Sequence, residues 1–283
     1  NVLVFSTYAT YVVMSFMMLV MIFMLVPQAQ VSAERINEVL DKKAHITEGS
    51  RTECTQRGTV EFRDVSFRYP HAAQDELEHI SFKAEKGQTV AVIGATGSGK
   101  TTLVSLIPRF YDATQGEVLV DGVNVKDLSF DALYDRIGYV TQKAVLFSGT
   151  VRDNVFFGES AQKENDETLS QALELSQAAE FVDQYREKAQ HPIAQLGRNV
   201  SGGQKQRLSI ARALARKPEI LIFDDSFSAL DYRTDAKLRE GLAKELPDTT
   251  KIIVAQRIST IRHADQILVL DRGAVAGQGT HDE

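Results

Sequence analysis

The feature that most constrains this chain is a glycine-rich turn, GATGSGKTT, at residues 94–102. It follows an apolar run, QTVAVIG, and precedes a helical pattern, TTLVSLIPRF, so it requires a strand, a tight loop and a helix in succession. In such a loop the backbone N–H groups converge on phosphate oxygens, and the helix N-terminus adds positive potential. Lys100 is expected to contact the β- and γ-phosphates, and the Thr101 hydroxyl to ligate Mg²⁺. The pattern predicts a nucleoside triphosphate site formed by Gly94, Thr96, Gly97, Ser98, Gly99, Lys100, Thr101 and Thr102.

From about residue 59 onward, strand patterns alternate with helical ones. The expected strands lie in VEFRDVSFRY, QTVAVIG, EVLVDG, RIGYVTQ, EILIFDD, TKIIVAQ and QILVLDRG. The expected helices lie in DETLSQALELSQAAEFV, GGQKQRLSIARALARK and DYRTDAKLREGLAKEL. This alternation predicts an α/β fold with a largely parallel sheet. Ligands of such sheets bind beyond the carboxyl ends of the strands.

The N-terminal part differs in composition. Residues 2–26 carry no charge, and as a helix they would span roughly 37 Å, enough to cross a bilayer. A signal peptide would have a basic start and a shorter apolar core, whereas a fully buried helix of a soluble protein is the alternative. After Pro27, Val31, Ile36, Val39 and Leu40 can share one face of an amphipathic helix. Arg35, Lys42 and Lys43 follow the apolar run, so we expect this end on the cytoplasmic side.

Composition narrows the function classes. The net charge of −6 gives no indication of nucleic-acid binding, and the one cysteine, Cys54, cannot form an internal disulfide. Residues 45–58 are polar and contain two glycines, so we expect a linker there. Because the chain starts on Asn1 without an initiator methionine and stops at GTHDE, we expect it to be a piece of a longer protein.

Two adjacent aspartates end the apolar run ILIFDD. Asp224 is expected to hold Mg²⁺ through water beside the glycine-rich loop; the alternative is a helix N-cap. The next residue in hydrolytic enzymes of this kind polarises the attacking water and is usually glutamate. Asp225 has one methylene less, which holds its carboxylate back by roughly 1.3–1.5 Å. Such a displacement can be costly in catalysis.

A second candidate anion site opens the helical pattern after Asn199. NVSGGQKQR places the Ser201 hydroxyl and the Gly202 and Gly203 N–H groups at a helix start. A plain capped helix is the alternative, because serine is a good N-cap.

In this order the motifs resemble the ATP-binding cassette (ABC) family over residues 59–283. Tyr69 in FRYP matches the aromatic residue that stacks on adenine, and Gln142 in YVTQ matches the Q-loop glutamine, which senses Mg²⁺ and faces the membrane domain. Residues 200–204, ending in Gln204, match the signature, with Val200 for the commoner leucine. Ser228 to Asp231 match the D-loop, and IIVAQRIST matches the switch region.

The resemblance implies an architecture. It is a P-loop NTPase (RecA-like) core with an antiparallel β subdomain and an α-helical signature subdomain at about 143–217, preceded by a transmembrane helix. Residues 1–44 would be the last transmembrane helix and its cytoplasmic extension, 45–58 a linker and 59–283 the nucleotide-binding domain. The cofactors implied are ATP and Mg²⁺, with Thr101, Gln142 and Asp224 at the metal.

A charge-free helix before the cassette resembles the last transmembrane helix of a type IV ABC exporter. That subfamily implies export of drugs, lipids or peptides by a multi-pass cell-membrane protein with a cytoplasmic nucleotide-binding domain. Polar and aromatic groups of the helix could line the path or simply pack against other helices. They are Ser6, Thr7, Tyr8, Thr10, Tyr11 and Ser15.

Two residues depart from the family pattern. Gln256 stands where a histidine is usual, and Asp225 where a glutamate is usual; His263 is too far along the chain to substitute. Losing positioned acid–base groups costs about 10²–10⁴-fold in rate, so binding without efficient turnover is expected, the alternative being slow but useful hydrolysis by Asp225.

Because cassettes pair head to tail, this chain's signature would serve the ATP of a second, non-identical half-transporter with a competent site. A homodimeric exporter with two weak sites and a non-hydrolysing regulatory subunit remain open. Membrane lipid and an unknown exported substrate are the other partners implied, with no nucleic acid.

Overall fold

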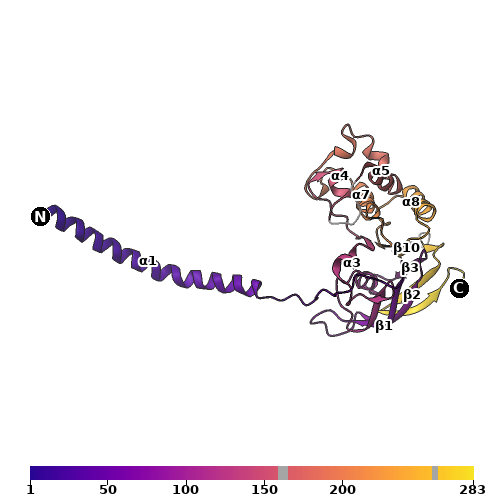
Figure 1. Ribbon diagram of the computed structural model, residues 1–283, viewed down its shortest axis with the longest axis horizontal. Coiled ribbons are helices and arrows are strands. Elements are labelled where there is room, and N and C mark those ends of the chain that lie inside the picture. The colour runs from indigo at the N-terminus through magenta and orange to yellow at the C-terminus, as the bar shows by residue number, and fades with distance from the viewer. Residues whose placement is uncertain (159–164, 257–260) are drawn as a thin grey trace. The chain divides into compact units, whose positions relative to one another are not determined.

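The computed structural model describes residues 1–158, 165–256 and 261–283 (Figure 1). The chain divides into two compact units, Asn1–Thr47 and Glu48–Glu283. The first unit is built on one helix, α1 (Val2–Leu40), which is long and apolar enough to cross a membrane, with a mean hydropathy of 2.4 over its most apolar stretch. The run before Pro27 and the amphipathic pattern after it therefore form one continuous helix.

The hydroxyl groups of α1 mostly bond to the helix itself. Thr7, Thr10 and Ser15 each donate to the carbonyl four residues earlier, at 2.8, 3.0 and 2.8 Å. This satisfies the hydroxyl groups without a neighbouring helix. The bonds are compatible with either expected role, path lining or packing.

The second unit contains a six-stranded sheet with the order β12-β11-β3-β10-β9-β6. Five strands are parallel: β3 (Thr89–Gly94), β6 (Ile137–Val140), β9 (Ile220–Asp224), β10 (Thr250–Val254) and β11 (Gln266–Asp271). Only β12 (Ala274–Gly279), at one edge, is antiparallel. The five parallel strands confirm the largely parallel core predicted from the apolar runs.

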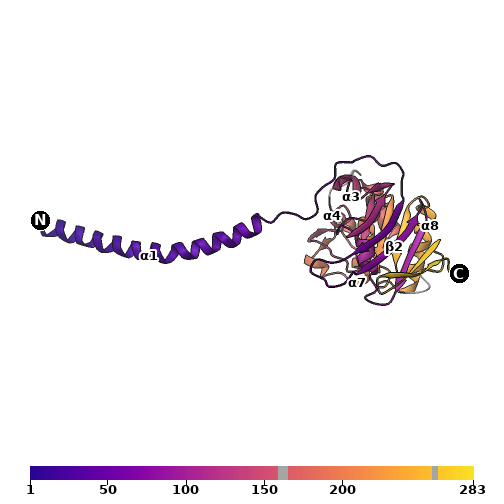
Figure 2. The same cartoon turned by 90° about the horizontal axis from the view of Figure 1, so that it is seen from below.

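A four-stranded antiparallel sheet packs beside it, in the order β2-β1-β4-β5. Its strands are β1 (Val60–Phe67), β2 (Leu77–Ala84), β4 (Gln115–Val120) and β5 (Val123–Asn124). The Glu78 N–H donates to the Gly273 carbonyl at 2.8 Å, which ties β2 to the turn between β11 and β12. Figure 2 shows β2 beside these C-terminal strands.

The parallel strands separate two hydrophobic cores, because alternate residues point to opposite faces. On β9, Leu221 and Phe223 belong to one core, and Ile220 and Ile222 to the other. The first core is shared with the helices, and the second with the antiparallel sheet and α2 (Lys100–Ser105). Burial on both faces explains why these strands read as uninterrupted apolar runs.

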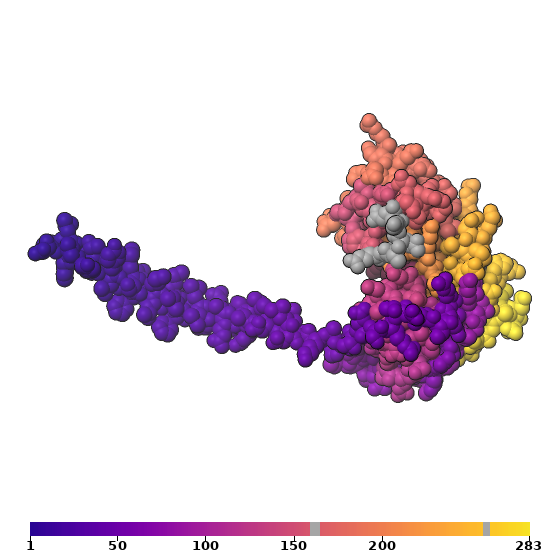
Figure 3. All heavy atoms as spheres, viewed as in Figure 1, coloured from indigo at the N-terminus to yellow at the C-terminus, as the bar shows by residue number. Residues whose placement is uncertain are grey.

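Most helices gather at one end of the second unit, with the two larger sheets at the other (Figure 1). Figure 3 shows the residues of the helical end, in pink to orange, gathered above the indigo residues of the same unit. This helical end contains α4 (Val151–Val155), α5 (Asp166–Leu175), α6 (Ala179–Val182) and α7 (Gly202–Ala215). Short elements connect them: β7 (Gly149–Thr150), β8 (Pro192–Ile193) and 3₁₀ turns at Lys188–Gln190 and Gln195–Gly197. Two further helices, α3 (Phe130–Tyr134) and α8 (Tyr232–Glu245), follow β5 and β9.

The expected single helix over residues 166–182 is wrong. It ends at Leu175, and Gln177 adopts a left-handed conformation with φ of 60°. The Gln177 N–H donates to the Glu174 carbonyl at 3.0 Å, and the Ala178 N–H to the Leu173 carbonyl at 2.8 Å. This pair of bonds is a Schellman motif, which closes α5 before α6 begins.

The segment after Thr47 is bonded to the second unit. The Gly49 and Arg51 N–H groups donate to the Leu128 and Asp127 carbonyls at 3.2 and 2.9 Å. The Gln56 N–H donates to the Asp121 carbonyl at 3.1 Å. Residues 48–58 therefore belong to the second unit and pack along its first strands and the turns between them.

Candidate functional site

The glycine-rich loop joins β3 to α2 as its sequence requires. A Cβ at Gly94, where φ is 153°, would lie 2.2 Å from the Leu270 carbonyl oxygen, and one at Gly99, where φ is 93°, would lie 2.7 Å from a Leu77 methyl. Only glycine fits either position. The Lys100 ammonium donates to the Gly94 and Ala95 carbonyls at 2.9 and 2.7 Å, so its charge lies within the loop.

The outer side of this loop is open. Ala95, Thr96 and Gly97 are exposed, and a Cβ built on Gly97 meets nothing within 4 Å. Ser98 is buried and lies 3.5 Å from the Lys100 ammonium. A loop with an exposed face and a cation at its centre is suited to an incoming polyphosphate.

Asp224 ends β9 beside the loop and is almost fully buried, with 4% of its surface exposed. The Thr101 hydroxyl donates to its Oδ1 at 2.9 Å, and the Tyr139 hydroxyl donates to its Oδ2 at 3.4 Å. Burial raises the pKa of Asp224, the Thr101 and Tyr139 hydrogen bonds lower it, and the neighbouring Asp225 raises it. The net direction is upward.

Asp225 accepts two amide donors on one oxygen. Gln142 Nε2 and Gln256 Nε2 lie 3.2 and 2.8 Å from Asp225 Oδ2. The backbone of Asp225 is left-handed, with φ of 49°, and its N–H donates to the Val254 carbonyl at 3.1 Å. The Q-loop glutamine, the second aspartate and the switch glutamine are thus brought together.

The rest of the expected switch segment, residues 257–260, lies outside the described residues. His263 lies within them and is exposed. It lines a separate cavity of about 420 Å³ together with α8 and β10, and no contact brings it to Asp225 in the part of the chain that the structure covers.

Tyr69 lies against the P-loop helix. Its hydroxyl is 2.9 Å from the Thr102 Oγ1, and its ring packs at steep angles against two other aromatic rings. Those of Phe67 and Tyr111 are centred 4.8 and 5.1 Å away, at interplanar angles of 81° and 87°. The structure therefore joins the expected base-stacking residue to the phosphate loop through Thr102.

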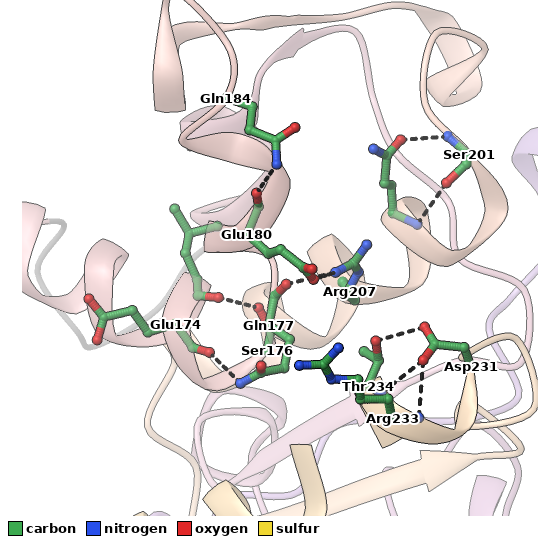
Figure 4. A network of polar contacts seen from close by, with 12 residues as sticks. Glu174, Ser176, Gln177, Glu180, Gln184, Ser201, Arg207, Asp231, Arg233 and Thr234 are labelled. Atoms are coloured by element: carbon green, nitrogen blue, oxygen red, sulfur yellow. Dashed lines mark hydrogen bonds and ion pairs between the residues drawn. The ribbon is translucent and has the colours of Figure 1, made fainter. Parts of the chain in front are cut away.

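The signature residues form the N-terminus of α7. The Ser201 hydroxyl accepts from the Gln204 N–H at 3.3 Å, and the Gln204 side chain accepts from the Ser201 N–H at 2.8 Å, which is a capping box (Figure 4). Gly202 and Gly203 begin the helix, and a Cβ on Gly202 would meet nothing within 4 Å. Among the described residues, no hydrogen bond joins residues 201–204 to the glycine-rich loop.

The D-loop residues cap the next helix. Asp231 is the N-cap of α8, and its carboxylate accepts from the Arg233 and Thr234 N–H groups at 3.1 and 3.0 Å (Figure 4). The Ser228 hydroxyl donates to the Asp225 carbonyl at 2.8 Å. This second contact connects the D-loop directly to the site.

Two contributors were missed in the sequence, Tyr139 and Tyr111. Tyr139 lies in the strand pattern three residues before Gln142, but only the pairing of that strand with β9 brings it to Asp224. Tyr111 follows α2 by six residues without any motif, and only the fold brings it to Tyr69.

The oxygen groups around Asp224 fit Mg²⁺ rather than a transition metal. Within residues 1–158, 165–256 and 261–283, no three His, Cys, Asp or Glu side chains are grouped to hold a metal ion. Mg²⁺ bound with a nucleotide needs no such group, because phosphates and water supply most of its ligands. Thr101 and Asp224 offer the hydroxyl and carboxylate that such a site uses.

Comparison with known protein families decides the classification. The model of the family described as ABC transporter matches residues 77–228, which include the glycine-rich loop, the signature and both aspartates. The chain belongs to the ABC transporter family. This ABC transporter chain therefore contains an ATP-binding domain with the mixed α/β fold of that family.

Similar full-length proteins are about twice as long. An uncharacterized ABC transporter ATP-binding protein of Mycobacterium tuberculosis is 43% identical over 286 residues, which cover 100% of this ABC transporter chain and 49% of that protein. An ATP-dependent lipid A-core flippase of Xanthomonas campestris pv. campestris is 40% identical and covers 92% of the chain and 44% of its own length. The chain thus spans about half the length of the curated relatives it matches.

A solved structure shows the same fold. The structure of a bacterial Atm1-family ABC exporter with ATP bound superposes with a TM-score of 0.84 and 31% identity. The match covers 92% of this ABC transporter chain and 46% of that exporter chain.

Proposed function

We propose that this chain is the ATP-binding part of an ABC exporter subunit. Residues 1–44 supply the last transmembrane helix and its cytoplasmic extension, and residues 59–283 the cytoplasmic nucleotide-binding domain of a multi-pass membrane protein. The apolar length of α1 and the similarity to an Atm1-family exporter and a lipid A-core flippase support this assignment. The domain binds ATP and couples its binding and hydrolysis to export.

The site residues then take the following roles. Tyr69 stacks on adenine, the loop from Gly94 to Thr102 holds the phosphates, and Lys100 neutralises them. Thr101 ligates Mg²⁺, with Asp224 and Gln142 holding its water ligands. The N–H groups and hydroxyl of Ser201, Gly202, Gly203 and Gln204 face the ATP bound to a partner chain. The exposed start of α7 supports this last role, as does the absence, among the described residues, of hydrogen bonds from it to the chain's own loop.

One observation carries the further proposal that hydrolysis at this chain's own loop is slow. Asp225 Oδ2 accepts hydrogen bonds from both Gln142 and Gln256, so its lone pairs are occupied by neutral amides. An amide cannot take up a proton as a histidine can. The shorter aspartate also places its other oxygen further from the nucleotide than a glutamate would. ATP is therefore bound firmly and hydrolysed inefficiently.

A slow site is useful when it is paired with a fast one. We infer a non-identical partner half-transporter that has a catalytically competent carboxylate of its own. The Ser201 region of this chain completes the ATP site of that partner. Membrane lipid surrounds the transmembrane part, and the exported substrate is bound there. A homodimer with two weak sites would lack the fast step.

The proposal of slow hydrolysis is tested by restoring the glutamate and the histidine that are usual at positions 225 and 256. In the complex with its partner, the double variant Asp225→Glu with Gln256→His should hydrolyse ATP faster by about tenfold or more at this site, because a positioned acid–base pair is recovered. The measurement is steady-state phosphate release with the partner's P-loop lysine replaced, so that only this site turns over. An unchanged rate would mean that the two departures do not limit hydrolysis.

A second measurement separates the heterodimer from the homodimer. The full-length chain purified alone should show little ATPase activity, and addition of its partner should raise the activity of the pair. Ordinary turnover by the isolated chain would instead support the homodimer.

A further inference from the structure

Asp224, the carboxylate expected beside Mg²⁺, is held from both sides. Thr101 on α2 donates to its Oδ1 at 2.9 Å, and Tyr139 on β6 donates to its Oδ2 at 3.4 Å. A carboxylate with one donor can still rotate about its terminal torsion. Donors on both oxygens, from two different elements, restrict this rotation.

The position of Tyr139 is itself well determined. Its backbone pairs with Ile222 on the neighbouring strand β9, two residues before Asp224. Its ring packs edge-on against Phe110, with centroids 5.4 Å apart and planes at 63°. These two contacts place the hydroxyl group beside Asp224.

The same short segment also reaches the second aspartate. Gln142, three residues after Tyr139, donates to Asp225 Oδ2 at 3.2 Å. Strand β6 thus contacts Asp224 through Tyr139, and the loop that follows the strand contacts Asp225 through Gln142.

We propose that Tyr139 is a positioning residue of the magnesium site: its hydroxyl holds Asp224 Oδ2, so that the carboxylate presents a fixed acceptor face to the water shell of Mg²⁺. The proposal rests on the proposed binding of MgATP at this loop. It assigns to Tyr139 a role in metal-dependent nucleotide affinity, not in the acid–base chemistry at Asp225. A tyrosine that only fills the core would have no such effect.

The test removes only the hydroxyl. In the full-length protein, Tyr139→Phe keeps the ring against Phe110 and deletes the donor to Asp224. ATP binding is measured in excess Mg²⁺ and again in EDTA. We expect the variant to bind ATP about three- to tenfold more weakly in Mg²⁺, with unchanged affinity in EDTA, because groups that orient a metal's ligands have effects of this order or larger.

A matched control is Tyr134→Phe. Tyr134 is 37% exposed, stacks on Phe130 and lies on α3, outside the site. Its variant should match the wild type in both media. Thermal unfolding of both variants checks that the fold is retained.

A double-mutant cycle provides an independent test. If Tyr139 acts through Asp224, Tyr139→Phe should add nothing further to the Mg²⁺ effect in an Asp224→Asn background. Additive effects would overturn the proposal, as would superimposable Mg²⁺ titrations of Tyr139→Phe and wild type. Equal weakening with and without Mg²⁺ would also overturn it, because that pattern shows a structural role. Wild-type protein that bound no ATP would overturn the proposed function itself.

Discussion

At the scale of single residues, the backbone of Asp225 explains why its missing methylene cannot be recovered by a small shift. Its N–H is bonded to Val254 on β10, and its carbonyl accepts from the Ser228 N–H and hydroxyl at 3.3 and 2.8 Å. The left-handed conformation, with φ of 49°, is one that aspartate tolerates better than most side chains. With the main chain held on both sides, only the side-chain length sets the reach of the carboxylate.

Tyr111 should contribute to nucleotide affinity through Tyr69. Tyr111→Ala removes the ring that packs edge-on against Tyr69 and, tilted, against Phe67 at 5.5 Å. Aromatic pairs are worth about 0.5–1.5 kcal/mol, so ATP should bind about two- to twelvefold more weakly. Tripolyphosphate, which lacks a base, should compete as well as before. Tyr111→Phe is the control and should bind normally; equal loss of ATP and tripolyphosphate binding would contradict this role.

A buried carboxyl far from the loop should make stability depend on pH. Asp121 is fully buried; its Oδ1 accepts from the Thr59 N–H at 2.8 Å, and Arg136 Nε lies 3.3 Å from its Oδ2. Burial, reinforced by the nearby Glu219, raises the pKa of Asp121 to about 6. The folded state therefore holds a proton that the unfolded state has lost between about pH 4 and pH 6.

The free energy of unfolding should fall as pH rises through that window, by at most about 1.4 kcal/mol per pH unit from this group. Asp121→Asn should remove that slope, whereas Asp183→Asn, at an exposed position, should keep it. Melting temperatures between pH 4.5 and 6.5 measure the difference. Parallel curves for wild type and Asp121→Asn would show that Asp121 does not titrate there.

At the scale of elements, the sequence identified those whose pattern is local. Strands β9 and β10 are apolar runs because both faces are buried, and α7 begins at a serine cap. Strand β2, LEHISFKA, was not identified, because it lies at the edge of its sheet and its exposed polar residues interrupt the apolar pattern. The end of α5 was missed because Gln177 adopts a left-handed conformation, which is uncommon for glutamine and could not be predicted from the residue type.

The same distinction holds for the site. Residues in contiguous motifs, such as Lys100 and Asp224, could be recognised from their spacing alone. Tyr139 and Tyr111 could not, because their roles depend on which strand lies next to β9 and on how the chain folds back after α2. The two amide bonds to Asp225 also join residues from three separate segments.

The capping box should stabilise the first turn of α7. Ser201→Ala removes the acceptor for the Gln204 N–H, and losing such a cap costs about 0.5–2 kcal/mol. Amide hydrogens of this turn should then exchange about two- to thirtyfold faster. Ser129→Ala, which uncaps α3 by loss of the bond from the Ala132 N–H, is the control and should leave α7 exchange unchanged. Unchanged exchange in Ser201→Ala would show that the helix start is held by other contacts.

At the scale of the whole molecule, the separation of the loop from the signature supports the proposed pairing with a second chain. The loop lies between β3 and α2, whereas Ser201 begins a helix at the other end of the unit (Figures 1 and 4). A complete ATP sandwich of the proposed kind therefore depends on which polypeptide faces this one. The non-identical partner is proposed from the departures at Asp225 and Gln256.

Because residues 1–283 contain one cysteine, the pairing can be tested by cross-linking. Cys54 is replaced by serine, and cysteines are placed at two exposed positions, Thr96 in the loop and Ser201 in the signature. In a homodimer these would face each other across the interface and form a disulfide-linked dimer in MgATP under mild oxidation. For a chain that needs a different partner, we expect the purified protein to stay monomeric on a non-reducing gel.

The positive control is the co-purified pair, with Ser201→Cys in this chain and a cysteine in the partner's glycine-rich loop, which should cross-link only when nucleotide is present. Because head-to-tail pairing brings the two motifs together only around ATP, the nucleotide dependence distinguishes a specific interface from random collision. A strong ATP-dependent dimer of this chain alone would favour two equivalent sites. In that case Asp225 itself would have to support the transport cycle.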